Sequence, residues 1–404
     1  MKRILSFFLV LCLAAAGTAV AGDAGGVSAG DVVLFGSYEQ DNNPDNGPEE
    51  IEWIVLDVQN GKAMLLSKYI LDAGKYNEET KAVTWDTCTL RTWLNSTFRD
   101  AAFSAEEQAE LITTKVSAPK KETLSYGVDP GKDTADEVYL MSKSLCERYL
   151  CNAPELQAAG ATAYAAQSLY TDRDGNARWM LRTPGRSNKS IAIIDEKGKV
   201  SDGSGVDSGC GIRPVIVVMA AHLDPEKVKP GEYTARMTAA AEAAAAEKQF
   251  RNDREALHEL CSTSGRRGME TLAGEPVVTG KLAIGIDLVH NTEDSINAMW
   301  YGYDFYGVPA EMLARTMAEA DTIVLIYPEH TPVGSYSGPK YAATAYRTTT
   351  RVTVMDPKEY ALYAPIDVAV NDPPETATVS EYTLAVSGEM DVEAAIAKVM
   401  ELYH

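Results

Sequence analysis

The chain has 404 residues, of which 45% are hydrophobic, and its 37 basic residues stand against 58 acidic ones, giving a formal net charge of −21. A chain of this length can bury more than one core, so two or three domains are expected. The acidic balance makes nucleic acid and anionic membranes poor partners, and it leaves cations, neutral sugars and basic peptides open.

The first 21 residues have the pattern of a secretory signal peptide. Lys2 and Arg3 precede an apolar run over residues 4–16, and Ala19-Val20-Ala21 forms an A-x-A cleavage site. The apolar run falls well short of the roughly 20 residues that a membrane-spanning helix needs, and no second stretch approaches that length. The sequence therefore predicts a secreted or extracytoplasmic protein of the cell envelope, without a transmembrane segment.

The cysteines do not form a recognisable framework. Five would follow the cleavage site, namely Cys88, Cys146, Cys151, Cys210 and Cys261. An odd number cannot pair completely, and the spacings match no zinc pattern. We expect most of them to be buried as small hydrophobic side chains, with one disulfide as the alternative.

Residues 30–233 are expected to form an α+β domain. Leu90, Trp93, Leu94 and Phe98 fall at helical spacing, which predicts a short helix with all four side chains on its buried face. Ser104 and Glu107 have the spacing of a capping box, which predicts the start of a second helix, and the Asn60-Gly61 pair predicts a tight hairpin turn. Alternating and apolar runs predict strands at 32–38, 52–58, 63–67, 137–142, 178–182, 190–195 and 211–219.

A helical linker over residues 234–264 is expected to separate this domain from a smaller one. Residues 234–261 contain neither Gly nor Pro, and 239–246 are nearly all alanine, so the pattern predicts one long helix that acts as a spacer. Residues 265–404 then predict a second α+β domain. Its expected strands are 281–289, 322–327 and 347–355, and its expected helices are 309–320 and 392–403.

A family resemblance rests on short motifs that follow one another in a specific order over residues 30–220. They are Phe35-Gly36-Ser37-Tyr38, Ile51-Glu52-Trp53-Ile54-Val55-Leu56, Leu65-Leu66-Ser67-Lys68, Thr84-Trp85 with Leu90-Arg91-Thr92-Trp93-Leu94-Asn95, Ala102-Phe103-Ser104, Tyr139-Leu140-Met141-Ser142, Trp179-Met180-Leu181-Arg182-Thr183-Pro184-Gly185 and Gly211-Ile212-Arg213-Pro214-Val215. The set resembles the DUF6273 family, an uncharacterised domain common in secreted and surface proteins of gut bacteria. Its two closing motifs also resemble, more distantly, the C-type-lectin-like fold of the sulfatase-modifying-factor superfamily. No family is recognised for the long helix or the C-terminal domain.

Two groups of aromatic and basic side chains are candidates for ligand binding. Arg182 and Arg213 come from different predicted strands, and Trp179 lies in the same strand as Arg182. The three side chains either bind a carboxylate or sugar ligand or serve the core, with the arginines paired to buried carboxylates. The structural reading is preferred for these three, because such tryptophans are usually core residues. The second group, in an expected loop of the C-terminal domain, is Trp300, Tyr301 and Tyr303. These side chains either bind a sugar or peptide or fill the interface between the domains.

Calcium is the only cofactor for which the sequence offers candidate ligands. Asp172, Asp174 and Asn176 place oxygen ligands at every second residue, as calcium loops do. Thr183 stands where a full EF-hand loop would carry its bidentate Glu, so the alternative of a hairpin turn at Asp174-Gly175 is preferred. The same two alternatives, a calcium site and a turn, apply to Asp41, Asn43 and Asp45.

The function favoured by these patterns is a non-catalytic extracellular binding or adhesion protein, whose ligand is a glycan, a peptide or a surface protein. The alternative is an envelope enzyme that acts on glycan or peptide substrates through Cys210 or a pair of carboxylates. Histidine is scarce, and His222 is the only one in the first domain, so a Cys210 nucleophile lacks the usual base there.

Overall fold

The computed structural model describes residues 26–120, 123, 127–262, 265–287, 308–338, 340–378, 383 and 385–404. The expected signal peptide lies outside these residues. The chain divides into two compact units, Met1–Ala244 and Ala245–His404, which we call the N-terminal and C-terminal units. Both contain helices and sheets, so the predicted α+β class is confirmed. No helix in the described ranges is both long and apolar enough to span a membrane.

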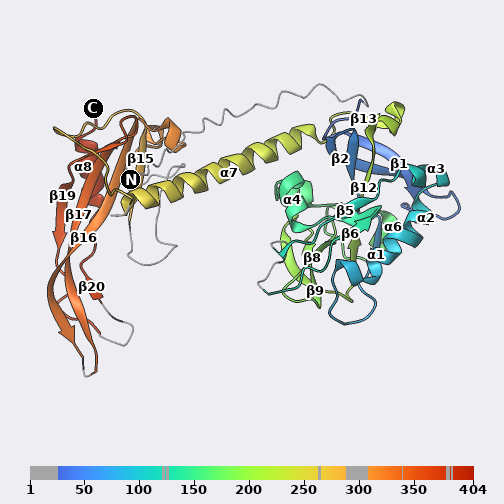
Figure 1. Ribbon diagram of the computed structural model, residues 1–404, viewed down its shortest axis with the longest axis horizontal. Coiled ribbons are helices and arrows are strands. Elements are labelled where there is room, and N and C mark those ends of the chain that lie inside the picture. Colours follow the sequence, from blue (N-terminus) through green and yellow to red (C-terminus); the bar gives the residue numbers. More distant parts are fainter. Residues whose placement is uncertain are drawn as a thin grey trace, which may run out of the picture. The chain divides into compact units, whose positions relative to one another are not determined.

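An antiparallel six-stranded sheet forms one layer of the N-terminal unit (Figure 1). The predicted hairpin turn at Asn60-Gly61 is confirmed, since both residues have positive φ angles (52° and 74°), as a type I′ turn requires. In spatial order the strands are β13 (Val228–Lys229), β1 (Val32–Tyr38), β2 (Glu49–Gln59), β3 (Lys62–Ser67), β12 (Pro214–Met219) and β7 (Val138–Leu140).

A second sheet of five strands shares the core of this unit. Its strand β11 runs parallel to β8 and antiparallel to β4. The side chains of Trp53, Trp85 and Trp179 are at most 2% exposed in this core. In spatial order the strands are β10 (Val200–Gly205), β9 (Ser190–Ile194), β8 (Trp179–Pro184), β11 (Cys210–Ile212) and β4 (Asp72–Gly74), and a separate pair is formed by β5 (Thr114–Val116) and β6 (Thr134–Asp136).

Short helices complete the N-terminal unit, and the main amphipathic stretch differs from its prediction in one respect. Leu90, Leu94 and Phe98 are buried as expected, but Trp93 is only half-buried. Trp93 is the last residue of the ordinary helix, which changes to a π-turn at Leu94. The elements are η1 (Trp85–Thr87), α1 (Thr89–Trp93), η2 (Leu94–Phe98), α2 (Arg99–Ala102), α3 (Ala105–Glu110), α4 (Lys143–Leu150), α5 (Pro154–Gln157), α6 (Ala163–Ala166), η4 (Ala220–His222) and η5 (Pro225–Lys227).

The predicted capping box at the start of α3 is confirmed. Ser104 Oγ accepts a hydrogen bond from the backbone N–H of Glu107 at 3.2 Å, and the Glu107 carboxylate accepts one from the backbone N–H of Ser104 at 2.9 Å. The same carboxylate also accepts the N–H of Gly36 at 3.0 Å. The cap therefore joins α3 to strand β1 as well as starting the helix.

The long helix is present as one continuous element, α7 (Thr234–Cys261) (Figure 1). Ala240 is buried with the core of the N-terminal unit, whereas Leu257, Leu260 and Cys261 are buried with a cluster of the C-terminal unit. The side chains between these two contacts are mainly exposed, as expected for an alanine-rich helix with a thin apolar face. Its role as a spacer stays a prediction, as do the exact domain limits.

The C-terminal unit is built on a sheet with a long antiparallel hairpin, β16 and β17 (Figure 1). The apolar side of α8 (Val392–Glu401) is buried with this sheet in a cluster that includes Ile396 and Val399. The strands are β14 (Thr271–Leu272), β18 (Ala361–Tyr363), β17 (Ala342–Asp356), β16 (Thr322–Ser337) and β15 (Leu282–Ile286) in spatial order, with β19 (Ile366–Asn371) and β20 (Ala385–Ser387) also paired to β17.

The predicted helix at 309–320 is wrong. Only two short 3-10 turns form there, η6 (Ala310–Met312) and η7 (Met317–Glu319). Between them, Leu313 forms a parallel bridge with Leu282, and the N–H of Ala314 donates to the carbonyl of Leu282 at 2.9 Å. Both side chains are buried, so pairing with the edge of the sheet overrides the local helical pattern.

Candidate functional site

Two residues singled out by the sequence, Trp179 and Arg213, meet inside the core. The Arg213 guanidinium lies 5.0 Å from the centroid of the Trp179 ring. Its nitrogens donate to the backbone carbonyls of Ser67 at 2.9 Å, Lys68 at 3.4 Å and Gln157 at 3.5 Å. Arg213 is 1% exposed and Trp179 is fully buried, so neither side chain is accessible to a ligand. These positions fit the role in the core that the sequence analysis preferred.

The hydrogen-bond partners of the two arginines differ from those that the sequence analysis predicted. We expected buried carboxylates, but the recorded partners of Arg213 are backbone carbonyls and an aromatic ring. Arg182 is likewise buried, and its Nη1 donates to the carbonyl of Ser117 at 2.8 Å. These guanidiniums therefore fasten loops to the core through the main chain, for which a forked donor with five N–H groups is well suited.

The segment 172–176 is a turn closed by its own aspartate. Asp172 Oδ1 accepts the backbone N–H groups of Asp174 at 2.9 Å and Asn176 at 2.8 Å, and the Asn176 amide donates to Oδ2 at 3.4 Å. These bonds form the usual side-chain-to-backbone turn of an aspartate. The preferred hairpin reading therefore fits the observed geometry.

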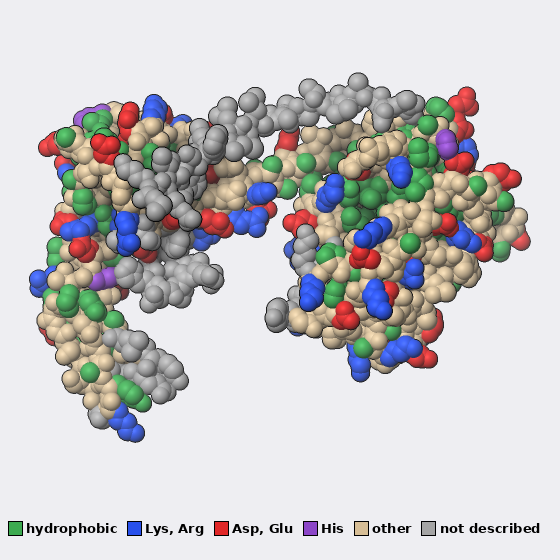
Figure 2. Space-filling model, viewed as in Figure 1, with side chains coloured by type: hydrophobic (Ala, Val, Ile, Leu, Met, Phe, Trp, Pro, Cys, Tyr) green, Lys and Arg blue, Asp and Glu red, His purple; other side chains and the backbone are tan. Residues whose placement is uncertain are grey.

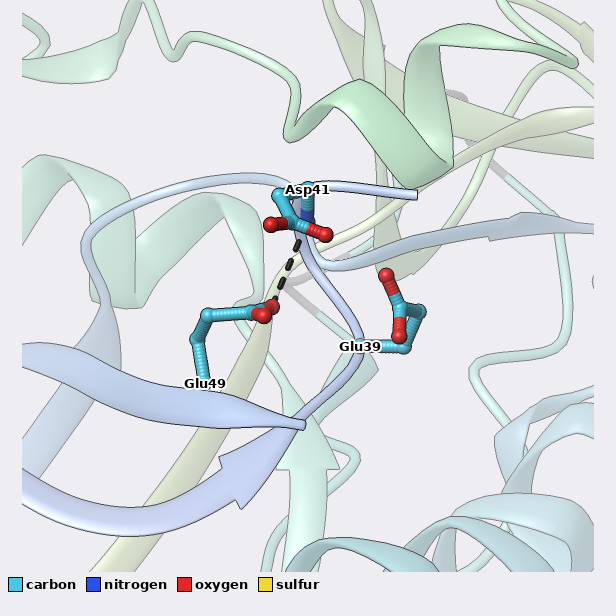
Figure 3. Close-up of side chains that lie close together, drawn as sticks. All are labelled: Glu39, Asp41 and Glu49. Carbon is cyan, nitrogen blue, oxygen red and sulfur yellow. Dashed lines mark hydrogen bonds between the residues drawn. The ribbon is translucent and has the colours of Figure 1, made fainter. Parts of the chain in front are cut away.

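Three other carboxylates converge where the chain passes from β1 to β2. The side chains of Glu39, Asp41 and Glu49 lie within 4.8 Å of one another (Figure 3). Each carboxylate already accepts a backbone N–H: Glu39 and Asp41 from Asn43 at 2.9 and 2.8 Å, and Glu49 from Gln40 at 2.7 Å. The loop between β1 and β2 is thus held together by its acidic side chains.

Cys210 does not have the surroundings of a nucleophile. It is fully buried on β11, and its thiol donates to the carbonyl of Arg178 at 3.6 Å. Burial raises the pKa of this thiol to about 12, whereas reactive cysteines have lowered pKa values and are accessible. None of the five cysteines in the described ranges takes part in a disulfide. Trp300, Tyr301 and Tyr303 lie outside the described residues.

The structure brings together a surface cleft that the sequence did not reveal. Its volume is about 630 Å³, and it opens over β4 and β11 beside the start of α1. Segments far apart in the chain supply its walls: the end of β1, the stretch after β4, the helix α1 with its π-turn, and α6. The lining residues are Tyr38, Asp72, Ala73, Gly74, Lys75, Glu78, Thr89, Leu90, Trp93, Thr97, Tyr164 and Ile212.

Four aromatic rings form a continuous row at this cleft, which we call the aromatic row. Trp93 lies 5.5 Å from Phe98, Phe98 lies 5.1 Å from Tyr38, and Tyr38 lies 6.1 Å from Tyr164, measured between ring centroids. Phe98 is fully buried, whereas the other three rings are partly exposed and line the cleft. The buried ring therefore supports the three that a ligand can reach.

Local hydrogen bonds hold the walls in place. Thr162 caps α6 by accepting the N–H of Ala165 at 3.2 Å, and the N–H of Tyr164 donates to the carbonyl of Gln40 at 3.0 Å, just after β1. On the other side, the N–H of Glu78 donates to the Thr89 hydroxyl at 3.1 Å. The loop after β4 is thereby joined to the start of α1, and a cleft built this way is preorganised.

Asp72 is the central charged group of the cleft. Its Oδ2 accepts the Tyr38 hydroxyl and its Oδ1 accepts the N–H of Ala73, each at 2.6 Å. Burial raises the pKa of this carboxyl, and it outweighs the two hydrogen bonds, which act to lower it. The charge of Asp72 is the largest cause of the raised pKa of Tyr164. The pKa of Tyr38 is also raised, first by burial and then by the hydrogen bond to Asp72. The three side chains therefore form one electrostatic group.

The lining offers aromatic rings, hydroxyl groups and carboxylates to a ligand. Partly exposed aromatic rings stack on sugars, peptides or cations, and carboxylates accept hydrogen bonds from hydroxyl or amine groups. None of the twelve described lining residues is a Cys or a His, so the usual nucleophile and base are missing from this cleft. Two carboxylates, Asp72 and Glu78, do share the lining, and Glu78 is paired with Lys75 at 3.6 Å.

Comparison with known proteins identifies the domain that carries the cleft. Residues 60–220 match the model of the DUF6273 family, described as a domain of unknown function. The chain therefore carries a DUF6273 domain, as its motifs indicated, and every lining residue except Tyr38 falls within the match. No curated protein and no solved structure matches the chain. The resemblance to a C-type-lectin-like fold stays a prediction.

Sequence reasoning missed the cleft because its parts come from five separate segments. Trp93 was assigned to the core as one of four apolar residues at helical spacing, whereas in the structure it lines the cleft just before a π-turn. Asp72 and Tyr38 are 34 residues apart in the sequence, and nothing local indicates their hydrogen bond. A π-turn is itself common at functional sites, but the sequence does not distinguish it from ordinary helix.

Proposed function

We propose that this chain is an exported, non-catalytic binding protein of the cell envelope, and that the cleft of its DUF6273 domain holds the ligand, a glycan or a peptide. The observation that carries the proposal is the row of three reachable aromatic rings beside the Asp72 carboxylate. Rigid aromatic side chains offer a large contact area at low entropic cost, which is typical of such binding surfaces. The signal-peptide pattern of residues 1–21 supports the location.

The distribution of surface charge also favours a glycan or a peptide as the ligand. On the face of the N-terminal unit seen in Figure 2, Lys and Arg side chains are interspersed with Asp and Glu. No basic field gathers there, and the whole chain is strongly acidic, whereas nucleic-acid binding requires clustered basic groups. A sugar, a peptide or another surface protein is consistent with this surface.

The second candidate is an envelope enzyme that acts on glycan or peptide through a carboxylate pair. The observation in its favour is that Asp72 and Glu78 line the same cleft, and Asp72 has a raised pKa, as the acid of such a pair requires. The Cys210 version of this candidate is disfavoured, because the thiol is buried and its pKa is raised.

A binding array tests the proposal. The full mature chain is applied to immobilised glycans, peptidoglycan fragments and peptides, with and without calcium, and compared with the variants Trp93→Ala and Tyr164→Ala. We expect saturable binding that weakens at least tenfold in both variants, because each removes a ring that lines the cleft. Tyr170→Ala is the matched control, since Tyr170 belongs to the same domain, is 76% exposed and lies outside the cleft.

The other outcomes of the array are equally informative. Turnover of a component that is abolished by Asp72→Asn or Glu78→Gln would favour the enzyme. Binding that is unchanged in the cleft variants but lost in Trp300→Ala and Tyr303→Ala would contradict the proposed cleft and assign the site to the C-terminal unit. Folding of each variant is checked by circular dichroism before its binding is interpreted.

A further inference from the structure

Among the residues that the structure describes, the hydrogen-bond donors to the Asp72 carboxylate are neutral groups. Its recorded donors are the Tyr38 hydroxyl and the N–H of Ala73, and no Lys, Arg or His of the described chain pairs with it. A half-buried carboxylate without a cationic partner is unfavourable for the fold, because burial removes water without supplying an opposite charge. A carboxylate with a perturbed pKa that lies in a cleft is a candidate functional group.

The neighbours of Asp72 suit a positive charge as well. Tyr38 and Tyr164 form an edge-to-face pair next to it, and Trp93 lines the same cleft. Aromatic rings attract ammonium groups within about 6 Å of their centroids, by roughly 0.5–2 kcal/mol depending on desolvation. The one cation in the lining, Lys75, is turned to Glu78, and the hydroxyls of Thr89 and Thr97 are neutral. Asp72 and Glu78 therefore leave the lining with a net negative charge.

We propose that the cleft selects its ligand through an ammonium group, seated between the Asp72 carboxylate and the rings of Tyr38, Tyr164 and Trp93. This inference deepens the proposed binding function and rests on it. The group can come from either of two sources, the free amine of a de-N-acetylated amino sugar or the side chain of a lysine in a peptide. Acetylation of the amine removes the charge in both sources while leaving the rest of the ligand nearly unchanged, so it separates charge recognition from simple stacking.

The experiment measures the affinity of the full mature chain for four probes by titration calorimetry at low salt. They are the hexamer of glucosamine, the hexamer of N-acetylglucosamine, a short peptide with a central lysine, and the same peptide with that lysine acetylated. We expect at least one amine probe to bind at least tenfold more tightly than its acetylated partner. We also expect its affinity to fall as salt is raised, because part of the attraction is between charges.

The variant Asp72→Asn is the decisive comparison. Its amide oxygen can still accept the N–H of Ala73, and its amide nitrogen can donate to the Tyr38 hydroxyl, but the group carries no charge. The amine probe should therefore bind at least tenfold more weakly, about 1.4 kcal/mol, while an acetylated probe should be unaffected. The fold is expected to survive, since burial disfavours the Asp72 charge and raises the pKa of this carboxyl. Asp172→Asn is the matched control, because that exposed turn lies outside the cleft.

Each remaining outcome separates this inference from the proposed function. If the acetylated probes bind as well as the amines, and Asp72→Asn has no effect, the ammonium inference fails; the proposed function still stands if Trp93→Ala weakens that binding. If no amine probe binds at millimolar concentration, the ammonium inference fails, and the array alone decides the proposed function. If an amine binds but Asp72→Asn and Trp93→Ala leave its affinity unchanged, both the inference and the proposed cleft are wrong.

Discussion

Replacing Arg213 with Met is expected to lower the free energy of unfolding of the N-terminal unit by about 2–4 kcal/mol. The guanidinium is 1% exposed, donates to the backbone carbonyls of Ser67, Lys68 and Gln157, and lies 5.0 Å from the Trp179 ring. Met fills similar volume but donates nothing, so three carbonyls lose a donor in the core. An aromatic contact with a desolvated cation is lost too.

An opposing effect has to be weighed in this substitution. Burial lowers the pKa of Arg213 to about 10, which shows that the charged form is disfavoured where it lies. Met removes that penalty, and buried ion pairs replaced by apolar residues are sometimes neutral for stability. Here the partners that remain are backbone carbonyls of three residues that stay in the core. The loss of their donors should therefore outweigh the removed desolvation penalty in the free energy of unfolding.

Thermal unfolding followed by tryptophan fluorescence measures this effect. The signal reports mainly on the N-terminal unit, where Trp53, Trp85, Trp93 and Trp179 lie. We expect a fall in Tm of several degrees, since about 1 kcal/mol corresponds to roughly 2–4 °C in a domain of 150–250 residues. The matched control is Arg173→Met, at an exposed arginine of the same domain, which should shift Tm by about 1 °C or less. An Arg213→Met protein as stable as the wild type would refute the structural role.

Replacing Phe98 with Ala is expected to destabilise the same unit by about 3–5 kcal/mol. The ring is fully buried and contacts Tyr38, Trp93 and Phe103, at centroid distances of 5.1, 5.5 and 6.3 Å. Its removal leaves a cavity within the aromatic row, so the cost includes both lost burial and lost contacts among aromatic side chains. The expected fall in Tm is roughly 10 °C.

Two further variants give this prediction its controls. Phe98→Leu keeps most of the volume and should lose much less stability, about 1 kcal/mol. Tyr170→Ala deletes an aromatic ring that is 76% exposed and should change Tm little. If Phe98→Ala unfolds at the wild-type temperature, the ring does not support the cleft, and the preorganisation that we infer for Trp93 and Tyr38 is wrong.

Much of the fold could be predicted because its signals are local. The turn at Asn60-Gly61, the capping box of Ser104 and Glu107, and the alanine-rich helix each follow from neighbouring residues, and the structure has all three. The helix expected at 309–320 failed for the opposite reason. There, a bridge between Leu313 and Leu282, 31 positions apart, overrides the pattern of the segment.

The candidate site could not be predicted for the same physical reason. Buried roles for Trp179 and Arg213 follow from their residue types and strand positions, and the structure places both in the core. The cleft instead depends on tertiary pairing, since β4 carries Asp72 only because it pairs with β11, with Asp72 opposite Ile212. The other feature is the π-turn that follows the half-buried Trp93. Neither feature leaves a periodic or compositional pattern in the sequence.

The accessibility of Trp93 with and without ligand is the most direct test of the claim that the cleft binds. In a Trp300→Phe background four tryptophans remain, of which Trp53, Trp85 and Trp179 are at most 2% exposed, so iodide quenching of fluorescence reports on Trp93. A saturating concentration of the glucosamine hexamer should lower the quenching constant severalfold, and Asp72→Asn should abolish this protection. Saturable binding of the hexamer that leaves the quenching of Trp93 unchanged would show that the ligand lies elsewhere.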